Sequence, residues 1–174
     1  AELIKTGIIG DASIIEILEK NYAKVILRDR KLLSELVARS VKFKASVVAK
    51  DEKESGLRRI LNFGHTFGHA IELHESVKHG YSVASGMELA TIFSYDKGLI
   101  DRKVCNRVIN LMKKYNLLNS YNISSDTIGE LILHDKKKSG DNIHFVFIEG
   151  IGIPEVRIVP VGEVIDFYKK FKKR

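Results

Sequence analysis

Apolar residues recur at helical spacing along most of the chain, so helix is the dominant predicted element. Ile14, Ile17 and Leu18, for example, share one face of a helix because they lie three or four positions apart. Aspartate or serine stands just before several such stretches, where either can cap a helix N-terminus. The pattern predicts helices at Glu2–Ile9, from an Asp11 or Ser13 cap to Lys20, from Asp29 or Arg30 to about Lys50, at Arg58–Glu72 and Tyr81–Gly98, from an Asp101 cap to Tyr115, from Ser124 or Ser125 to Asp135, and from Val161 to Phe171.

Two short stretches near the C-terminus follow a different pattern. Ile143–Ile148 and Glu155–Val159 alternate apolar and polar residues as strands do, and the turn-forming Gly150, Gly152 and Pro154 separate them. At 174 residues the chain has the usual length of one domain. The predicted fold is therefore mainly α, a single domain over residues 1–174 with a small β-hairpin near its C-terminus.

The helix that ends near Lys50 is expected to bury a stripe that includes Leu33, Leu36 and Val37. Lys44 falls at the centre of that stripe. A lysine at such a position usually lays its stem on apolar surface and keeps its ammonium group in water. The pattern alone therefore assigns no chemical role to Lys44.

The Arg58–Glu72 stretch carries several polar side chains on one side of the predicted helix. If it is one helix, Arg58, Asn62, His65 and His69 fall within roughly 60° of one another. A guanidinium, a carboxamide and two imidazoles have no use in a hydrophobic core, so this stripe is a candidate binding surface. The other side carries the packing residues Leu61, Phe63, Phe67, Ala70 and Ile71.

Gly64 and Gly68 stand one turn apart in the same stretch. Each costs about 1 kcal/mol relative to alanine inside a helix. A helix that contains both is expected to bring a ligand or another backbone close to its own main chain.

A third histidine follows. The polar segment 75–78 is long enough to form a turn that returns His79 toward His65 and His69. A lone His-x3-His pair most often consists of surface or core histidines. Two or three neutral imidazoles with one carboxylate and an open position, however, form the ligand set of a catalytic zinc site. The carboxylate has to come from elsewhere in the chain.

Composition and charge reduce the number of function classes that the chain could belong to. The net charge is +7, and much of it comes from the C-terminal lysines and from 136–138. Nucleic-acid binding is disfavoured because no base-reading motif accompanies these runs and no aromatics are interleaved with them; a small anionic substrate explains the interior lysines better. The single cysteine, Cys105, excludes a disulfide framework and fits a cytoplasmic setting. No apolar run approaches the roughly 20 residues that span a bilayer, so no membrane partner is expected.

The ordered motifs of this chain resemble the 3-dehydroquinate synthase family. The likeness covers nearly all 174 residues, and its motifs occur in the family's order. The matching segments are Ala1–Lys5, Lys44–Val48 with Glu54, Gly56–Arg58, Leu61–Glu72, His79-Gly80, Val83–Met87, Asp135–Lys137, Gly140 and Phe145–Gly152.

The resemblance implies the helical C-terminal domain of the dehydroquinate synthase-like fold. Family members carry an NAD-binding domain before this point, which we expect to be absent from this chain, because no Gly-x-Gly-x-x-Gly is present. No NAD-binding residue is therefore assigned here. The resemblance also implies a homodimeric enzyme that converts the sugar acid phosphate DAHP to 3-dehydroquinate and phosphate by NAD-dependent oxidation, phosphate elimination, reduction and aldol closure. We expect the isolated chain to be essentially inactive.

The resemblance further implies roles for particular residues. Glu2, His65 and His79 match the family's ligands for zinc, or cobalt. Arg58 and Lys44 match the positions that bind the substrate carboxylate. Asn62, His69 and Lys136 match the positions around the phosphate, and Lys137 is an equal candidate for the role given to Lys136. Lys5 and Glu54 match other residues lining the site. Of these, His69, Asn62 and Lys5 are the expected catalytic residues.

The chain departs from the family pattern at one position, and other enzyme classes have to be weighed. The family usually has His-Gly-Glu where this chain has His79-Gly80-Tyr81, so support for His79 could differ. A metal- and NAD-dependent polyol or alcohol dehydrogenase, or a related sugar-phosphate cyclase, shares the two-domain plan, but the dehydrogenase has no need of a carboxylate-binding pair. A metalloprotease is disfavoured because His65-Thr66-Phe67-Gly68-His69 lacks the glutamate of His-Glu-x-x-His.

Overall fold

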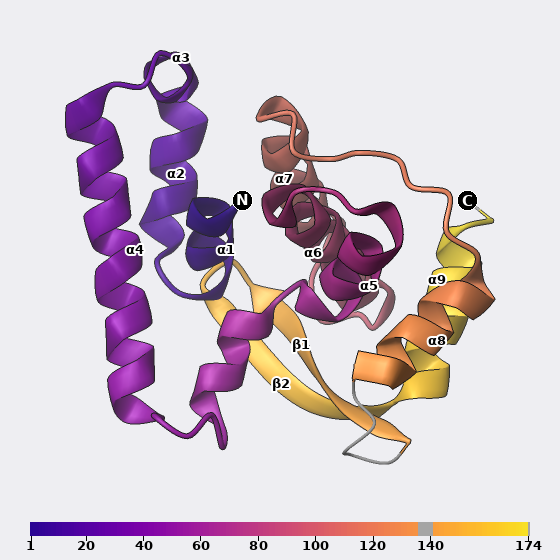
Figure 1. The fold of residues 1–174 in the computed structure, drawn as a ribbon. Coiled ribbons are helices and arrows are strands. Elements are labelled where there is room, and N and C mark those ends of the chain that lie inside the picture. Colours follow the sequence, from indigo (N-terminus) through magenta and orange to yellow (C-terminus); the bar gives the residue numbers. More distant parts are fainter. Residues whose placement is uncertain (136–140, 174) are drawn as a thin grey trace.

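A computed structural model describes residues 1–135 and 141–173, except for the side chain of Asp135 (Figure 1). The described part is mainly helical with one hairpin, which confirms the predicted fold class. Its elements are α1 Glu2–Ile9, α2 Ala12–Lys20, α3 Tyr22–Ile26, α4 Arg30–Lys50, the 3-10 helix η1 Leu57–Asn62, α5 His65–Glu75, α6 His79–Asp96, α7 Arg102–Lys114, α8 Ser125–Asp135, β1 Asn142–Gly150, β2 Ile153–Pro160 and α9 Val161–Phe171.

Aspartate caps set several helix starts as predicted. Asp11 accepts a hydrogen bond from the backbone N–H of Ser13 at the start of α2. Asp29 and Asp101 each accept one from the backbone N–H three positions later, at the starts of α4 and α7. The helix predicted from Tyr81 instead begins at His79, two residues earlier. The His79 imidazole therefore projects from the first residue of α6 rather than from a loop.

The α5–α6 pair forms the centre of the molecule, and one prediction about it was wrong. Arg58–Glu72 is not a single helix: η1 ends at Asn62, and α5 begins only at His65. Between them Gly64 adopts φ +80°, a left-handed conformation that no helix interior contains.

Close backbone packing explains this break. A Cβ on Gly64 would lie 2.7 Å from the backbone nitrogen of Met87, and a Cβ on Gly86 of α6 would overlap the carbonyl oxygen of Gly64. Gly68 likewise faces the backbone of Val83. The glycines mark a close helix–helix approach, as their spacing predicted.

The hairpin closes the other side of the core. β1 and β2 pair antiparallel, with Phe145 opposite Arg157, and both strands are longer than predicted. Phe93 of α6 stacks on Phe167 of α9 with ring centroids 4.4 Å apart and meets Phe147 edge-on at 5.1 Å. This aromatic cluster fixes α6, and hence its N-terminal residue, relative to the hairpin.

Helix α4 lies at the edge of the molecule, packed against α1 and η1 (Figure 1). Leu36 and Val47 are buried, but Val37 is 52% exposed, so its predicted place in the buried stripe was wrong. The reason is that, within the described part of the chain, α4 has neighbours on one side only. Lys44 is accordingly exposed rather than central to a buried stripe.

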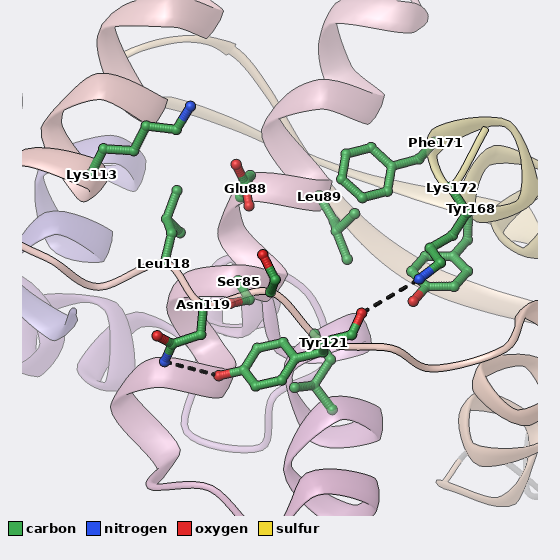
Figure 2. A pocket seen from close by; sticks show the side chains of 12 residues that line it. Ser85, Glu88, Leu89, Lys113, Leu118, Asn119, Tyr121, Tyr168, Phe171 and Lys172 are labelled. Carbon is green, nitrogen blue, oxygen red and sulfur yellow. Dashed lines mark hydrogen bonds between the residues drawn. The ribbon is translucent and has the colours of Figure 1, made fainter. Parts of the chain in front are cut away.

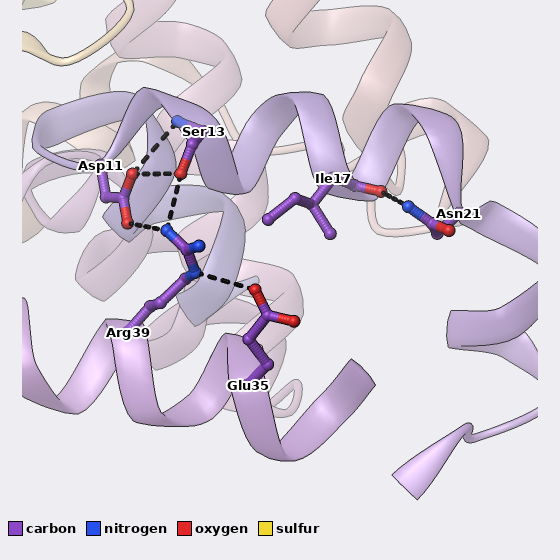
Figure 3. A network of polar contacts seen from close by, with 6 residues as sticks. All are labelled: Asp11, Ser13, Ile17, Asn21, Glu35 and Arg39. Atoms are coloured by element: carbon purple, nitrogen blue, oxygen red, sulfur yellow. Dashed lines mark hydrogen bonds and ion pairs between the residues drawn. The ribbon is translucent and has the colours of Figure 1, made fainter. Parts of the chain in front are cut away.

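Polar contacts hold α4 in place. Arg39 donates to Ser13 Oγ at 3.0 Å and to Glu35 Oε1 at 3.2 Å, and its guanidinium lies 3.4 Å from Asp11 Oδ2 (Figure 3). Thr6 of α1 and Ser40 of α4 share a 2.8 Å hydrogen bond. These contacts tie the helix that carries Lys44 to the first two helices. In the described ranges, no helix is long and apolar enough to cross a bilayer.

Candidate active site

A cavity of about 190 Å³ opens between α1, α4, η1 and the start of α5. It gathers residues that are up to 63 positions apart in the sequence. Residues predicted for the site make up most of its lining: Glu2, Lys5, Lys44, Glu54, Arg58, Asn62 and His65, alongside Thr6, Ile9, Ser40 and Leu61.

Helix α1 contributes a buried lysine to this cavity. Lys5 is 6% exposed, and its Nζ lies 2.9 Å from Glu2 Oε1. Burial lowers the pKa of Lys5, although Glu2 opposes this. Burial acts to raise the pKa of Glu2, but Lys5, with help from His65 and Lys44, lowers it overall. The Glu2 carboxylate therefore sits in a positive environment.

A single carboxylate organises the chain that leads into η1. Asp51 accepts hydrogen bonds from the backbone N–H groups of Ser55, Gly56 and Arg58 at 2.8–2.9 Å. These bonds lower the pKa of Asp51 to about 2. The segment 51–58 is thus folded back on itself, which places the Arg58 side chain at the cavity.

Glu54 connects the two polar side chains of η1 that face the cavity. Its Oε1 accepts a 2.7 Å hydrogen bond from Asn62, and its Oε2 lies 4.0 Å from Arg58 Nε. Glu54 itself has φ +55°, an uncommon conformation for a residue other than glycine. With Lys5, Lys44 and Arg58 against Glu2 and Glu54, the lining carries a net positive charge suited to an anionic ligand.

Three imidazoles meet beside the cavity. The ring centroids lie 5.2 Å apart for His65 and His69, 5.6 Å for His65 and His79, and 6.4 Å for His69 and His79. The segment between α5 and α6 therefore returns His79 to the other two histidines, as its length predicted. Two imidazoles bound to one zinc ion have centroids about 5 Å apart, given Zn–N bonds of about 2 Å.

The hydrogen bonds of His65 and His79 fix which ring nitrogen is available. Nδ1 of His65 lies 3.2 Å from the carbonyl oxygen of Phe63, and Nδ1 of His79 lies 2.8 Å from Glu72 Oε2. Both partners can only accept, so Nδ1 carries the proton in each case. Nε2 of each ring is thereby left with a lone pair, as a metal ligand requires.

Electrostatics favour a neutral His65. Burial, followed by the nearby positive charge of Lys5, lowers the pKa of His65 to about 4. The imidazole is then uncharged at neutral pH, which suits it to metal binding.

The third predicted ligand is engaged elsewhere. Among the described residues, no group of three or more His, Cys, Asp or Glu side chains is arranged to hold a metal ion. Glu2 lines the cavity with His65 and a neighbouring groove with His79, but its carboxylate is turned to Lys5. The ring spacing and the Nδ1 contacts of the two histidines are compatible with a zinc site, which Glu2 would complete by turning away from Lys5. The ligand set of Glu2, His65 and His79 remains a prediction.

Two predicted site residues, Lys136 and Lys137, lie outside the described residues. Asp51 and Glu72 make direct contacts at the site, although the sequence pattern assigned neither of them a role. Glu72 lies within the histidine stretch, seven positions after His65, and that spacing was the only available signal.

A larger cavity lies elsewhere, on another side of α6. It has a volume of about 540 Å³ and is lined by α6, α7, α9 and the segment around Asn119 and Tyr121 (Figure 2). Burial raises the pKa of Glu88, which lies there with Lys113. None of the predicted site residues that are described lines it, so size does not identify the candidate active site.

Comparison with known proteins points to one family. A family model described as 3-dehydroquinate synthase C-terminal matches residues 1–138. The chain is similar to the 3-dehydroquinate synthase of Corynebacterium diphtheriae, with 44% identity over 87% of this chain and 43% of that protein. It is also similar to that of Dictyoglomus thermophilum, with 42% identity over 99% of this chain and 49% of that protein. The chain spans about half the length of these relatives.

Solved structures share the fold. The 2-epi-5-epi-valiolone synthase of Streptomyces hygroscopicus, with NAD⁺ and Zn²⁺ bound, superposes with a TM-score of 0.86 at 21% identity, over 99% of this chain and 50% of that one. A 2-deoxy-scyllo-inosose synthase in complex with carbaglucose-6-phosphate, NAD⁺ and Co²⁺ superposes with a TM-score of 0.69 at 25% identity, over 80% of this chain and 41% of that one.

Proposed function

This chain belongs to the 3-dehydroquinate synthase family, whose C-terminal domain it matches, and from that premise we propose that it is the metal- and substrate-binding half of such an enzyme. The proposed reaction converts DAHP to 3-dehydroquinate and phosphate. The single observation that supports it most is the cavity that brings Lys5, Lys44 and Arg58 to the histidine cluster. A substrate with both a carboxylate and a phosphate needs such a concentration of positive charge.

Each charged group of the substrate has candidate partners in this chain. Arg58 and Lys44 would bind the carboxylate, since a planar guanidinium matches it with two parallel hydrogen bonds and the ammonium adds a point charge. Asn62 and His69 would donate to the phosphate, with Lys136 or Lys137 as a further partner. Lys5, held within the cavity by Glu2, would orient a substrate hydroxyl.

The metal and the nucleotide would supply the remaining chemistry. A zinc or cobalt ion held by Glu2, His65 and His79 would act as a Lewis acid that acidifies a substrate hydroxyl and polarises the ketone formed from it. NAD, bound mainly by an N-terminal domain, would accept the hydride. This chain's own part is to hold the substrate in place and to position the proton-donating and proton-accepting groups around it.

The partners of the domain follow from the same proposal. The relatives are about twice as long as this chain, which supports an N-terminal NAD-binding domain as its immediate partner. We also propose that the complete enzyme is a homodimer. A polyol dehydrogenase is not favoured, because the relatives are named as synthases and a polyol has no carboxylate for Arg58 and Lys44.

Reconstitution tests the proposed function. The chain would be mixed with the separately expressed N-terminal half of a relative, together with NAD, zinc and DAHP, and phosphate release would be followed. We expect activity only with both halves, and we expect His65→Ala and His79→Ala to abolish it. Phosphate release by the chain alone, or a reconstituted enzyme that oxidises polyols but ignores DAHP, would contradict the proposal.

A further inference from the structure

The contact between Glu72 and His79 joins the two helices that carry the imidazoles. Glu72 lies in α5, the helix of His65 and His69, whereas His79 is the first residue of α6. Oε2 of Glu72 accepts the proton-bearing Nδ1 of His79 at 2.8 Å. The neighbouring hydroxyl of Ser82 donates to the His79 carbonyl oxygen at 2.8 Å and lies 3.4 Å from the same Glu72 oxygen.

We propose that Glu72 is the positioning residue of His79: it fixes the ring's orientation and its tautomer, so that Nε2 faces His65. The inference rests on the proposed function, because it gives Nε2 of His79 to the metal. Carboxylates that accept the second N–H of a metal-binding histidine orient the ring and raise its basicity. Within the described residues, no other carboxylate forms a hydrogen bond with His79.

The position of His79 makes such a partner necessary. Its side chain is 52% exposed, and it follows a short segment rather than a packed turn of helix. An exposed side chain loses conformational entropy when it is fixed, and a bond to a rigid element offsets that loss. Glu72 is on the same helix as His65 and His69, so this one bond sets the position of His79 relative to both rings.

The first turn of α6 contains no acidic residue, and Tyr81 stands two positions after His79. The carboxylate that contacts His79 lies instead on the preceding helix, across the turn.

The same helix offers a matched control. Glu75 accepts from Nδ1 of His74 at 3.2 Å, which is also a carboxylate–imidazole contact in α5. It lies outside the histidine cluster. If the carboxylates in α5 affect only the stability of the helix, substitutions at Glu72 and at Glu75 should change zinc affinity to a similar extent.

Zinc affinity of the 174-residue chain, measured by competition with a chromophoric chelator, tests the inference. We expect Glu72→Ala to weaken zinc binding by about 10- to 100-fold. Glu72→Gln should weaken it less, because the amide oxygen still accepts from Nδ1, and Glu75→Ala should leave it unchanged. Thermal unfolding of the metal-free proteins would show that each variant is folded.

A second readout needs no metal. ¹⁵N NMR of the histidine rings should show His79 protonated at Nδ1 in the parent chain and in Glu72→Gln, with a shift toward protonation at Nε2 in Glu72→Ala. Unchanged zinc affinity in Glu72→Ala, or an equal loss in Glu75→Ala, would overturn the inference while leaving the proposed function standing. A parent chain that binds no zinc, or binds it as well after His65→Ala and His79→Ala, would overturn both.

Discussion

Lys5 and Glu2 face each other one turn apart on α1, with Lys5 Nζ 2.9 Å from Glu2 Oε1. The carboxylate assigned to the metal is therefore paired with a buried ammonium group of the same helix. If the proposed metal ion recruits Glu2, it has to compete with Lys5, and Lys5 would then be released toward the cavity that it lines. Metal binding and the charge available to the substrate would in that case be coupled through this pair.

Removing that competitor should tighten metal binding. In Lys5→Met the apolar stem is kept, Glu2 is freed and one positive charge near the ion is lost. We expect zinc affinity to rise on the order of tenfold, given the size of such charge interactions at partly buried sites. Lys20→Met, which removes the partner of Glu16 in an exposed pair on α2, serves as the control and should change nothing. Equal or weaker zinc binding by Lys5→Met would show that the pair does not oppose the metal.

Asp51 should make stability depend on acid pH. Its pKa is about 2 in the folded chain, against about 3.9 for an unperturbed aspartate. A lowered pKa means that the stabilising contribution is complete above about pH 4 and is lost as the pH falls toward 2. Urea midpoints of the parent chain and Asp51→Asn should therefore differ most near neutral pH and converge near pH 2. Asp166→Asn, on the exposed side of α9, is the matched control for the loss of a carboxylate.

The helices that the sequence predicted best are those marked by a capping residue or by regular apolar spacing. Aspartate caps and apolar spacing located α1, α2, α4 and α7 well, because both signals are local. The break at Gly64 was not predicted, since a 3-10 helix followed by an α-helix keeps nearly the same apolar spacing as one helix. Exposure of Val37 could not be predicted either, because an amphipathic pattern does not show how many neighbours a helix has.

The candidate site, like the fold, could be predicted from the sequence only in part. His79 could be expected near His65 because a short polar turn joins two helices. Glu2 and Lys5 stand three positions apart on one helix, a spacing at which two side chains can meet. The Glu72–His79 bond depends instead on how α6 starts against α5, which is a tertiary property. The Asp51 bonds to three backbone N–H groups are likewise invisible in the sequence, since any aspartate before a turn presents the same pattern.

The contact between α5 and α6 gives a stability prediction. In Gly86→Ala the new methyl group would overlap the carbonyl oxygen of Gly64, and backbone cannot move aside as a flexible side chain can. We expect a loss on the order of 3 kcal/mol in the free energy of unfolding. Gly162→Ala is the counterpart: Gly162 lies in α9, and no atom of the described residues would lie within 4 Å of the new Cβ, so the change should stabilise the chain by about 0.5–1 kcal/mol. Urea unfolding measures both; a tolerated Gly86→Ala would mean that the two helices can separate without penalty.

Arg58 should discriminate between a carboxylate and other anions. Arg58→Lys keeps the positive charge but loses the planar pair of donors, while the backbone N–H of residue 58 still bonds to Asp51. We expect the KM for DAHP of the reconstituted enzyme to rise about 10- to 100-fold, as the loss of a charge-assisted hydrogen bond of roughly 1.5–3 kcal/mol predicts.

The neighbouring residue supplies the control. Arg59 contacts the ring of His144 and does not line the site cavity, so Arg59→Lys should leave KM unchanged. An analogue of DAHP that lacks the carboxylate should bind the parent enzyme and Arg58→Lys with similar affinity, because the lost donors have no partner on it. If Arg58→Lys weakens both ligands equally, Arg58 contributes only general positive charge, and the carboxylate has to be recognised elsewhere in the cavity.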